Sequence, residues 1–218
     1  MEWYSTPEGG GWTGMGGGGH VENGFWHQLF GLLFADILLD RQPDQESQTD
    51  DSPWPSPCMD APLDWSLRGF WEGRRKPALQ ERLTTILTDR GGGEQPGSQE
   101  GDGSMVRTIR SNWGRFHGVP VAMVDWDRHG HACEDMCVAA RCLGGRVVHA
   151  VCSRFARDHN LWHHGLPDLF MLKPRENLAK LVEVKGPGDS LSNAQISWIE
   201  ALVEVGCDIE VCHVTRPH

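Results

Sequence analysis

The chain has 218 residues, of which 39% are hydrophobic, so it supports one generous domain or one domain with insertions. Its seven cysteines are odd in number and form no C-x-x-C pair, which argues against a disulfide framework and a zinc ribbon and indicates a reducing compartment. The net charge of −10 is unusual for a DNA-binding protein, which normally carries a basic track for phosphates. The sequence has no run of about 18 apolar residues and no signal-peptide pattern, so we expect no transmembrane span and no membrane partner.

The charge is unevenly divided along the chain. Residues 1–104 carry 7 Lys and Arg against 17 Asp and Glu, whereas residues 105–218 carry 13 against 13 and hold 9 of the 11 histidines. The second half is therefore neutral and has no strong basic patch. If the protein binds DNA, either a few well-placed cations hold the phosphates or a basic domain outside this chain does so.

The beginning of the chain is rich in glycine, which favours a flexible lead, although Trp3 and Trp12 are not typical of a linker. Residues 25–39 are apolar on all sides, which predicts a buried helix. Glu22 and Asn23 stand at the head of this helix, where an anion and a cap are favourable. A role in starting the helix is therefore one explanation for Glu22.

Two stretches predict loops. Residues 40–65 are acidic and proline-rich, and residues 91–104 are a low-complexity, glycine-rich insertion. Between them, the apolar residues of 69–87 recur at helical spacing. The basic cluster at 74–76 could contact phosphates, direct nuclear import or form a solvated helix start, and the solvated helix start fits its surroundings best.

Regular structure is predicted again after the insertion. Residues 105–113 predict a helix, and residues 119–124 predict the first strand of the sheet. Residues 133–143 predict a further helix, which Gly144 and Gly145 stop. A second helix is expected from about residue 147 to residue 159.

Two short apolar runs, 165–172 and 180–187, are each of strand length and are separated by a polar loop rich in turn formers, which predicts a hairpin. Asp168 stands at the entrance of the first strand, directly behind a proline. On the second strand Glu183 and Lys185 are two residues apart, so both side chains lie on one face. Two charges on an apolar strand are costly unless they are paired or bound to a metal.

One more helix and one more strand follow the hairpin. Residues 189–192 cap a predicted helix that Gly206 terminates. Gln195 lies one turn into this helix, where it could serve a functional site or simply face solvent. Residues 208–214 alternate between apolar and polar side chains and predict a strand that closes the sheet.

Acidic side chains that converge from neighbouring strands suit a hard divalent cation such as Mg²⁺. Such a cation lowers the pKa of a bound water and shields an attacked phosphate, and a nearby lysine can orient or activate the nucleophile. The Asp-x14-Glu-x-Lys spacing of Asp168, Glu183 and Lys185 is the pattern of PD-(D/E)xK nucleases. The spacing alone is a weak signal, because a hairpin can carry solvated charges without any such function.

The flanking residues carry a more specific resemblance. The motifs are Gly-Leu-Pro-Asp-Leu at 165–169, Leu-Val-Glu-Val-Lys-Gly-Pro-Gly-Asp at 181–189, Leu-Ser-x-x-Gln at 191–195 and Glu-Val-Cys-His-Val at 210–214. Together they resemble the VRR-NUC domain of the PD-(D/E)xK superfamily and, more narrowly, the C-terminal nuclease domain of the Fanconi-associated nuclease family. The resemblance covers nearly all of the chain, apart from the acidic loop and the glycine-rich insertion.

The resemblance implies an α/β fold of the restriction-endonuclease-like type, with a mixed sheet flanked by helices. Residues 1–104 would form the N-terminal helical part of the nuclease domain, including the acidic loop and the glycine-rich insertion. Residues 105–218 would form the VRR-NUC core. Longer family members also carry a SAP-type DNA-binding region and a helical repeat domain, neither of which is in this chain.

The resemblance also implies a set of site residues. The catalytic residues of the family correspond to Asp168, Glu183 and Lys185, of which Lys185 would position or activate the water. The metal, Mg²⁺ or Mn²⁺, would be held by Glu22, Asp168, Glu183 and the carbonyl of Val184. For Glu22 the resemblance thus adds the role of a third acidic ligand to that of starting a helix.

Contacts with DNA are less well matched. Gln195 corresponds to a glutamine that the family places near the active site. The family often shows Arg or Lys facing the DNA at three positions where this chain has neutral residues: Asn160, Ser190 and Ala194. His159, His163 and His164 could substitute as weaker, pH-dependent cations. We therefore expect Gln195, His159 and His164 to contact DNA or to support the site, and we expect a weakened grip on DNA.

The function implied by the resemblance is Mg²⁺- or Mn²⁺-dependent phosphodiester hydrolysis, as a 5′-flap endonuclease and 5′-to-3′ exonuclease in interstrand-crosslink repair in the nucleus. Its partners would be branched or flapped DNA and repair-complex proteins bound through domains absent from this chain. Two alternatives remain. The chain could be a nuclease-like module without independent DNA cleavage, or a stand-alone junction-resolving VRR-NUC nuclease.

Overall fold

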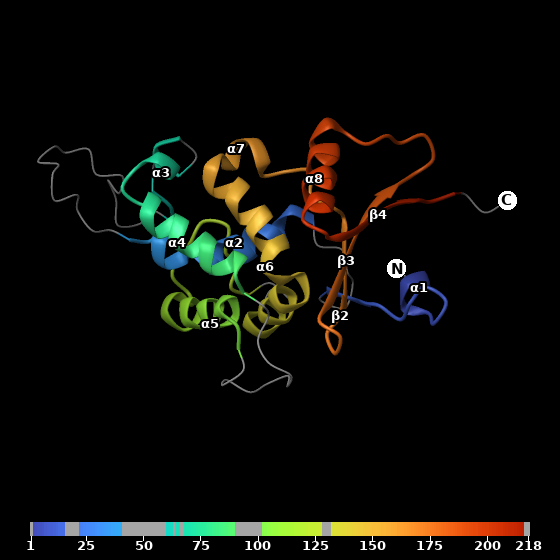
Figure 1. The fold of residues 1–218 in the computed structure, drawn as a ribbon, viewed down its shortest axis with the longest axis horizontal. Coiled ribbons are helices and arrows are strands. Elements are labelled where there is room, and N and C mark those ends of the chain that lie inside the picture. Colours follow the sequence, from blue (N-terminus) through green and yellow to red (C-terminus); the bar gives the residue numbers. More distant parts are fainter. Residues whose placement is uncertain are drawn as a thin grey trace, which may run out of the picture.

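The computed structural model describes residues 2–15, 22–40, 60–62, 64–65, 68–89, 102–127 and 132–215. Its strands are β1 (Thr13–Gly14), β2 (Leu169–Lys173), β3 (Leu178–Lys185) and β4 (Asp208–His213). Its helices are α1 (Glu2–Ser5), α2 (Glu22–Leu38), α3 (Arg68–Glu72), α4 (Lys76–Leu87), α5 (Ser104–Phe116), α6 (Cys133–Arg157), α7 (His159–Trp162) and α8 (Asn193–Glu204). Figure 1 shows α2 to α7 gathered to the left of the sheet, whereas α1 lies to its right.

The strands form one mixed sheet in the order β1-β2-β3-β4. β2 runs antiparallel to β1 and to β3, and β4 runs parallel to β3 after the chain crosses over through α8. The turn between β2 and β3 contains Asn177 in a left-handed conformation, with a φ of 52°, which asparagine tolerates better than most residues. The predicted hairpin and the predicted mixed sheet flanked by helices are both confirmed.

The two faces of the sheet pack against different layers, because successive side chains of a strand point to opposite sides. On the side that we call the helical face, Phe170 and Leu181 belong to the large core that the helices build. On the opposite side, the N-terminal face, five buried residues form a separate small cluster: Tyr4, Trp12, Leu169, Met171 and Val182. The sheet is therefore covered on its second face by residues 2–15.

Several polar contacts anchor this N-terminal segment to the sheet. Within the segment, the amide of Trp12 donates a hydrogen bond to the carbonyl of Tyr4 at 2.7 Å. The hydroxyl of Tyr4 joins the segment to the sheet, because it donates to the carboxylate of Glu210 on β4. The ammonium group of Lys173 lies 4.7 Å from the ring centre of Trp12, within range of a cation–π interaction. Residues 2–15 are thus a packed cover and not a flexible lead.

α2 confirms the predicted buried helix. Its apolar side chains from Phe25 to Leu38 are almost completely inaccessible to solvent, as the absence of a polar stripe in the sequence predicts. The helix packs against α4, α5 and α6. Its first turn reaches the sheet, where the ring of Phe25 lies 4.9 Å from the ring of Phe170 on β2.

α6 contains the break that its two glycines predict. Gly144 adopts a non-helical conformation with a φ of 73°, which glycine reaches at little cost. Gly145 is needed for a different reason, because a Cβ atom there would overlap the carbonyl oxygen of Ile86 and lie 2.8 Å from that of Asp89. The end of α4 can therefore approach α6 only where this side chain is missing.

α6 is the one helix of the described residues that is both long enough and apolar enough to be compared with a membrane span. By length and composition alone it could cross a membrane, but 67% of its most apolar window is buried inside the structure. It packs against α2, α3, α4, α5, α7 and α8 as well as against the sheet. These contacts are those of a central core helix.

The strand predicted at residues 119–124 is wrong, because the structure has a turn there. Met123 takes a left-handed conformation with a φ of 72°, which a strand does not allow. The backbone after the turn is held by the buried side chain of Gln28. Its Nε2 atom donates to the backbone carbonyl of Asp125 at 3.2 Å, and its Oε1 atom accepts from the backbone amide of Asp125 at 2.7 Å. A side chain on α2 thus makes the backbone hydrogen bonds that a neighbouring strand would otherwise make.

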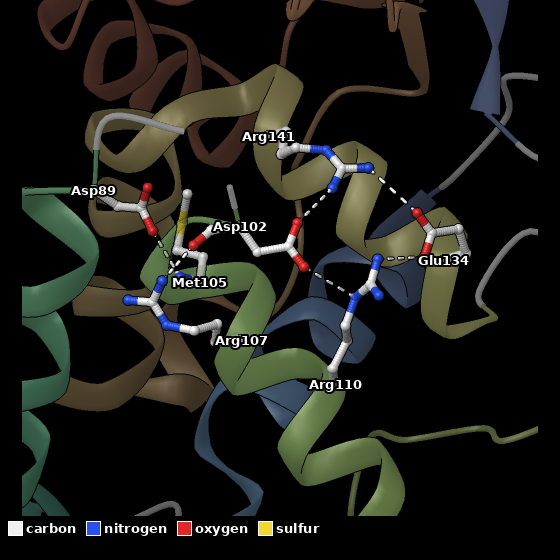
Figure 2. Close-up of polar contacts among 7 residues, drawn as sticks. All are labelled: Asp89, Asp102, Met105, Arg107, Arg110, Glu134 and Arg141. Carbon is white, nitrogen blue, oxygen red and sulfur yellow. Dashed lines mark hydrogen bonds and ion pairs between the residues drawn. The ribbon is translucent and has the colours of Figure 1, made fainter. Parts of the chain in front are cut away.

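The junction of α5 and α6 is held by a cluster of two acids and two arginines (Figure 2). The carboxylate of Asp102, with only 7% of its side chain exposed, lies 3.4 Å from Nε of Arg110 and 3.3 Å from Nη1 of Arg141. Glu134 completes the cluster, at 2.8 Å from Arg110 and 3.3 Å from Arg141. Each arginine is therefore shared between two carboxylates, which ties the start of α5 to α6.

The basic cluster at residues 74–76 is likewise neutralised within the chain. Each of its three cations pairs with a carboxylate: Arg74 with Asp40 at 3.1 Å, Arg75 with Asp64 at 2.8 Å and Lys76 with Glu72 at 2.9 Å. Arg75 is almost fully buried, and burial lowers its pKa. The cluster thus belongs to the structure around α3 and α4 and is not a free track for phosphates.

We predict that Gly145→Ala lowers the free energy of unfolding by about 1–3 kcal/mol, because overpacking forces α4 away from α6. Gly114→Ala is the matched control, since Gly114 lies in α5 with nothing within 4 Å of its added Cβ. That control should stabilise the protein by about 0.5–1 kcal/mol. Urea denaturation of both variants measures the difference, and equal stability would contradict the close contact.

Candidate active site

The pairing of β2 with β3 brings the two acids of the hairpin together. Leu169 pairs with Val182, so one step further along the antiparallel register Asp168 stands opposite Glu183. Side chains directly opposite each other lie about 5 Å apart at their Cβ atoms and point to the same face. Two carboxylates thus face each other at the end of the sheet, a repulsive arrangement unless a cation lies between them or nearby.

Asp168 precedes β2 and is held by β3. Its Oδ2 atom accepts a hydrogen bond from the amide of Val184 at 2.9 Å. This contact fixes the carboxylate beside the carbonyl groups at the end of β3, while Pro167 before it cannot extend the ladder. Among the described residues Oδ1 of Asp168 has no hydrogen-bond partner, which leaves this oxygen available for a ligand.

Glu183 is the most deeply buried acid of the site, with 1% of its surface exposed. Its Oε1 atom lies 2.9 Å from the ammonium group of Lys185 and accepts a hydrogen bond from the side-chain amide of Gln195. Burial raises the pKa of the Glu183 carboxyl, and the charge of Asp168 also raises it, whereas Lys185 and Gln195 lower it. The carboxylate of Glu183 is therefore held in place, but the one ammonium group beside it does not offset both its burial and the charge of Asp168.

Gln195 joins the start of α8 to the charged side chains of β3. Its backbone amide donates to the hydroxyl of Ser192 at 3.2 Å, and its side-chain oxygen accepts from the amide of Ser192 at 2.9 Å, which completes a capping box. The same oxygen accepts from the ammonium group of Lys185 at 3.0 Å. The sequence left two roles open for Gln195, one at a functional site and one as a side chain that simply faces solvent. Its hydrogen bonds agree with the first role and not with the second.

Gly165 allows this end of α8 to approach the hairpin. Its φ is 89°, and an added Cβ would lie 2.9 Å from the Cβ of Ala194 and 3.2 Å from the amide nitrogen of Gln195. A second contact fastens the same loop to the helix, because the indole of Trp198 donates to the carbonyl of His164 at 3.0 Å. The role of Gly165 was not predicted, since the residues that it contacts lie nearly thirty positions further along the chain.

Glu22 is the first residue of α2, and its side chain lies outside the described residues. The helix nevertheless begins beside the hairpin of β2 and β3. The rings of Phe25 and Trp26 lie 4.9 Å and 6.1 Å from the ring of Phe170, which is two residues after Asp168. The position of Glu22 along the chain is therefore consistent with a third acidic ligand, and the assignment stays a prediction.

The predicted histidines lie next to the site but differ in environment. His159 is half-buried between the rings of His27 and His163, and burial lowers its pKa to about 4, with a further lowering by these two neighbours. Its ring is therefore neutral near pH 7 and supports packing more readily than it binds a phosphate. His163 and His164 are exposed, with ring centres 4.7 Å apart, although Nδ1 of His163 already lies 2.8 Å from the carbonyl oxygen of Asn160.

The donor set fits a hard divalent cation. Asp168 and Glu183 supply carboxylate oxygens and Val184 a carbonyl oxygen, the ligands that Mg²⁺ and Mn²⁺ prefer over nitrogen and sulfur. Burial is the main cause of the raised pKa of Glu183, and the like charge of Asp168 adds to it, so a cation bound here would offset both effects. No group of three acids, histidines or cysteines that could hold an ion is found among the described residues, which include only two carboxylates here.

The fold is that of an α/β nuclease domain. It is similar to the crystal structure of paFAN1 bound to DNA with a 2-nucleotide 5′ flap, with a TM-score of 0.71 and 28% identity over 90% of this chain and 31% of that one. A second crystal structure of paFAN1, with a 1-nucleotide 5′ flap, gives the same TM-score at 26% identity, again over 90% of this chain and 32% of the other. The chain belongs to the VRR-NUC domain family, whose model matches residues 101–216.

The chain is homologous to Fanconi-associated nuclease 1 over nearly its whole length. It is 34% identical to the Homo sapiens protein over 203 residues, which are 93% of this chain and 18% of that protein. It is 33% identical to the Oryza sativa homologue over 216 residues, which are 97% of this chain and 19% of the relative. The chain therefore spans about a fifth of the length of the curated relatives that it matches.

We predict that Asp168→Asn stabilises the metal-free protein at neutral pH by about 0.2–1 kcal/mol, because it removes a like charge directly opposite Glu183 and keeps an oxygen for the Val184 amide. The folded state raises the pKa of Glu183, so it binds more protons than the unfolded chain, and this contribution to stability falls as the pH rises through that raised value. The gain from Asp168→Asn should therefore vanish at low pH, where both carboxyls are protonated.

Asp189→Asn is the matched control for this prediction. Asp189 also accepts a backbone hydrogen bond, from the amide of Gly186 at 3.0 Å, but it lies outside the acidic pair. Thermal melts of both variants in EDTA, between pH 3 and pH 8, compare the two changes. A loss of stability in Asp168→Asn equal to that of the control would mean that the two carboxylates do not repel each other in the fold.

Proposed function

We propose that this chain is a divalent-metal-dependent DNA nuclease domain that hydrolyses phosphodiester bonds at the site formed by β2, β3 and α8. The observation that carries the proposal is the meeting of Asp168 and Glu183 on one face of the sheet, with the ammonium group of Lys185 2.9 Å from Glu183. Membership of the VRR-NUC family and the similarity to Fanconi-associated nuclease 1 support it.

The chain's own residues divide the work of such a site. Asp168, Glu183 and the carbonyl of Val184 would hold Mg²⁺ or Mn²⁺, with Glu22 as the third acid. When bound, the cation supplies positive charge that polarises the phosphate and makes a water molecule a better nucleophile. Lys185 orients that water or stabilises the charge that develops on the phosphate. Gln195 acts as a positioning residue, because it contacts both side chains of the Glu-x-Lys pair.

The proposed substrate is flapped or branched DNA. The structural relatives were crystallised with DNA carrying 5′ flaps, and the curated relatives are Fanconi-associated nucleases. We therefore assign to this chain 5′-flap endonuclease and 5′-to-3′ exonuclease activity in interstrand-crosslink repair, in the nucleus. The exposed rings of His163 and His164 belong to the loop that Trp198 of α8 fastens through the carbonyl of His164, and they are candidates for phosphate contacts.

A second candidate function is a nuclease-like module that cannot grip DNA alone. The observation in its favour is the state of the positive charges, because ion pairs within the fold occupy the cluster at 74–76 and also Arg82, Arg110, Arg141 and Lys180. A phosphate would have to displace a carboxylate at each of these positions. This chain would then supply the residues for hydrolysis, whereas another protein or domain would supply the affinity for DNA.

Cleavage of a 5′-labelled flap substrate with Mn²⁺ at low salt tests the first function against the second. We predict incision by the natural protein and a loss of at least about a hundredfold in Lys185→Ala and Asp168→Ala, the size typical of removing a transition-state contact. Lys76→Ala is the matched control, since it removes an exposed lysine whose partner is Glu72. If neither the natural protein nor any variant cleaves the substrate, with all proteins folded, the result would favour the non-cleaving module.

We predict separately that Mg²⁺ or Mn²⁺ stabilises the fold. A ligand that binds only the folded state adds about 2.7 kcal/mol at a hundred times its Kd, so the melting temperature should rise with millimolar metal. The rise should be lost in Asp168→Ala and kept in Asp189→Asn. A melting temperature that does not respond to either metal would contradict the metal site, whatever the result with DNA.

A further inference from the structure

His213 lies beside Lys185, at the end of β4. β4 runs parallel to β3, and its last pair joins Lys185 to His213. Paired residues of neighbouring parallel strands point to the same face, and the packing of this sheet agrees. Leu181 and its partner Ile209 both belong to the core of the helical face, so Lys185 and His213, four residues later on each strand, belong to that face too.

The backbone holds His213 firmly at this position. The amide of Val214 donates to the carbonyl of Lys185 at 2.8 Å, so the ladder continues past His213. Neighbouring strands are about 4.8 Å apart, which brings the stem of the His213 ring within about 5 Å of the stem of Lys185. The face therefore carries a row across three strands: Asp168 before β2, Glu183 and Lys185 on β3, and His213 on β4.

His213 has no structural task that would explain its position. Its side chain is exposed, belongs to neither core cluster and has no hydrogen-bond, ionic or ring partner among the described residues. Lys185 beside it is nearly buried and satisfied by Glu183 and Gln195. The row therefore ends in one polar ring that faces the solvent next to the charged centre.

We propose that His213 is a substrate-contacting residue, whose ring N–H donates a hydrogen bond to a phosphate oxygen of the DNA backbone beside the hydrolysed bond. The inference rests on the proposed nuclease function and adds a residue to it. A phosphate is the ligand that the surroundings favour, because Lys185 separates His213 from the two carboxylates. The described residues also offer His213 no partners for a metal site.

The first test measures binding of a fluorescent 5′-flap DNA with Ca²⁺ in place of Mn²⁺. His213→Ala should weaken binding about ten- to a hundredfold, the effect of losing one hydrogen bond to a charged oxygen. His213→Asn keeps an N–H donor and should recover part of the loss. In cleavage with Mn²⁺ the same variants should raise KM by a similar factor, while kcat at saturating DNA changes by less than about twofold.

His117→Ala serves as the matched control. His117 is another exposed histidine, but it follows α5, which packs against α2, α4 and α6, and its ring contacts Trp113 and Trp126. Its removal should leave the affinity for DNA unchanged. Melting curves with and without Mn²⁺ should be the same for His213→Ala and the natural protein, since the exposed ring supports neither the core nor the metal ligands.

The outcomes separate this inference from the proposed function. Equal affinity and equal KM for His213→Ala and the natural protein would overturn the contact, while cleavage by both would leave the nuclease intact. A loss of kcat without a change in affinity would also overturn it. If the natural protein does not cleave DNA, the proposed function fails, and the binding measurement with Ca²⁺ still decides whether His213 touches the backbone.

Discussion

The candidate site depends on two like charges that the sheet forces to face each other. An antiparallel pair places Asp168 and Glu183 side by side at the end of the sheet, and Glu183 is almost completely withdrawn from water. Such a pair is unfavourable in itself, and one ammonium group does not neutralise it. The packed core behind the hairpin, built from α2, α6 and α8, supplies the stability that keeps the acids together. Functional sites commonly concentrate unfavourable electrostatics in this way.

The start of α8 connects helix geometry to the chemistry of the site. Gln195 closes the capping box of the helix, and the same side chain contacts both Glu183 and Lys185. A shift of the helix would therefore move the two charged groups relative to each other. Gly165 sets how closely the helix can approach, which makes a residue without a side chain one of the determinants of the site.

Local patterns in the sequence predicted the elements whose causes are local. The hairpin, the buried helix α2 and the break at Gly144 follow from periodicity, turn formers and the permitted conformations of glycine. The failed strand at residues 119–124 has a distant cause, because Gln28 lies 97 residues from the Asp125 backbone that it holds. The residues that Gly165 contacts, Ala194 and Gln195, are likewise far from it in the sequence. The charged triad and Gln195 were visible as motifs, but their contacts depend on the crossover that brings β4 and α8 against β3.

The cover on the N-terminal face sets the limits of the folding unit. The stretch that the VRR-NUC model matches begins at residue 101, yet Tyr4 and Trp12 shield Leu169 and Val182 from solvent, and α2 fills the main core. A fragment cut to the family boundaries would present two uncovered apolar surfaces, one on each side of the sheet. Surfaces of that kind drive self-association. We therefore expect the matched stretch to need both residues 2–15 and α2 for a stable fold, so an exchange of this domain between family members would have to carry these two segments with it.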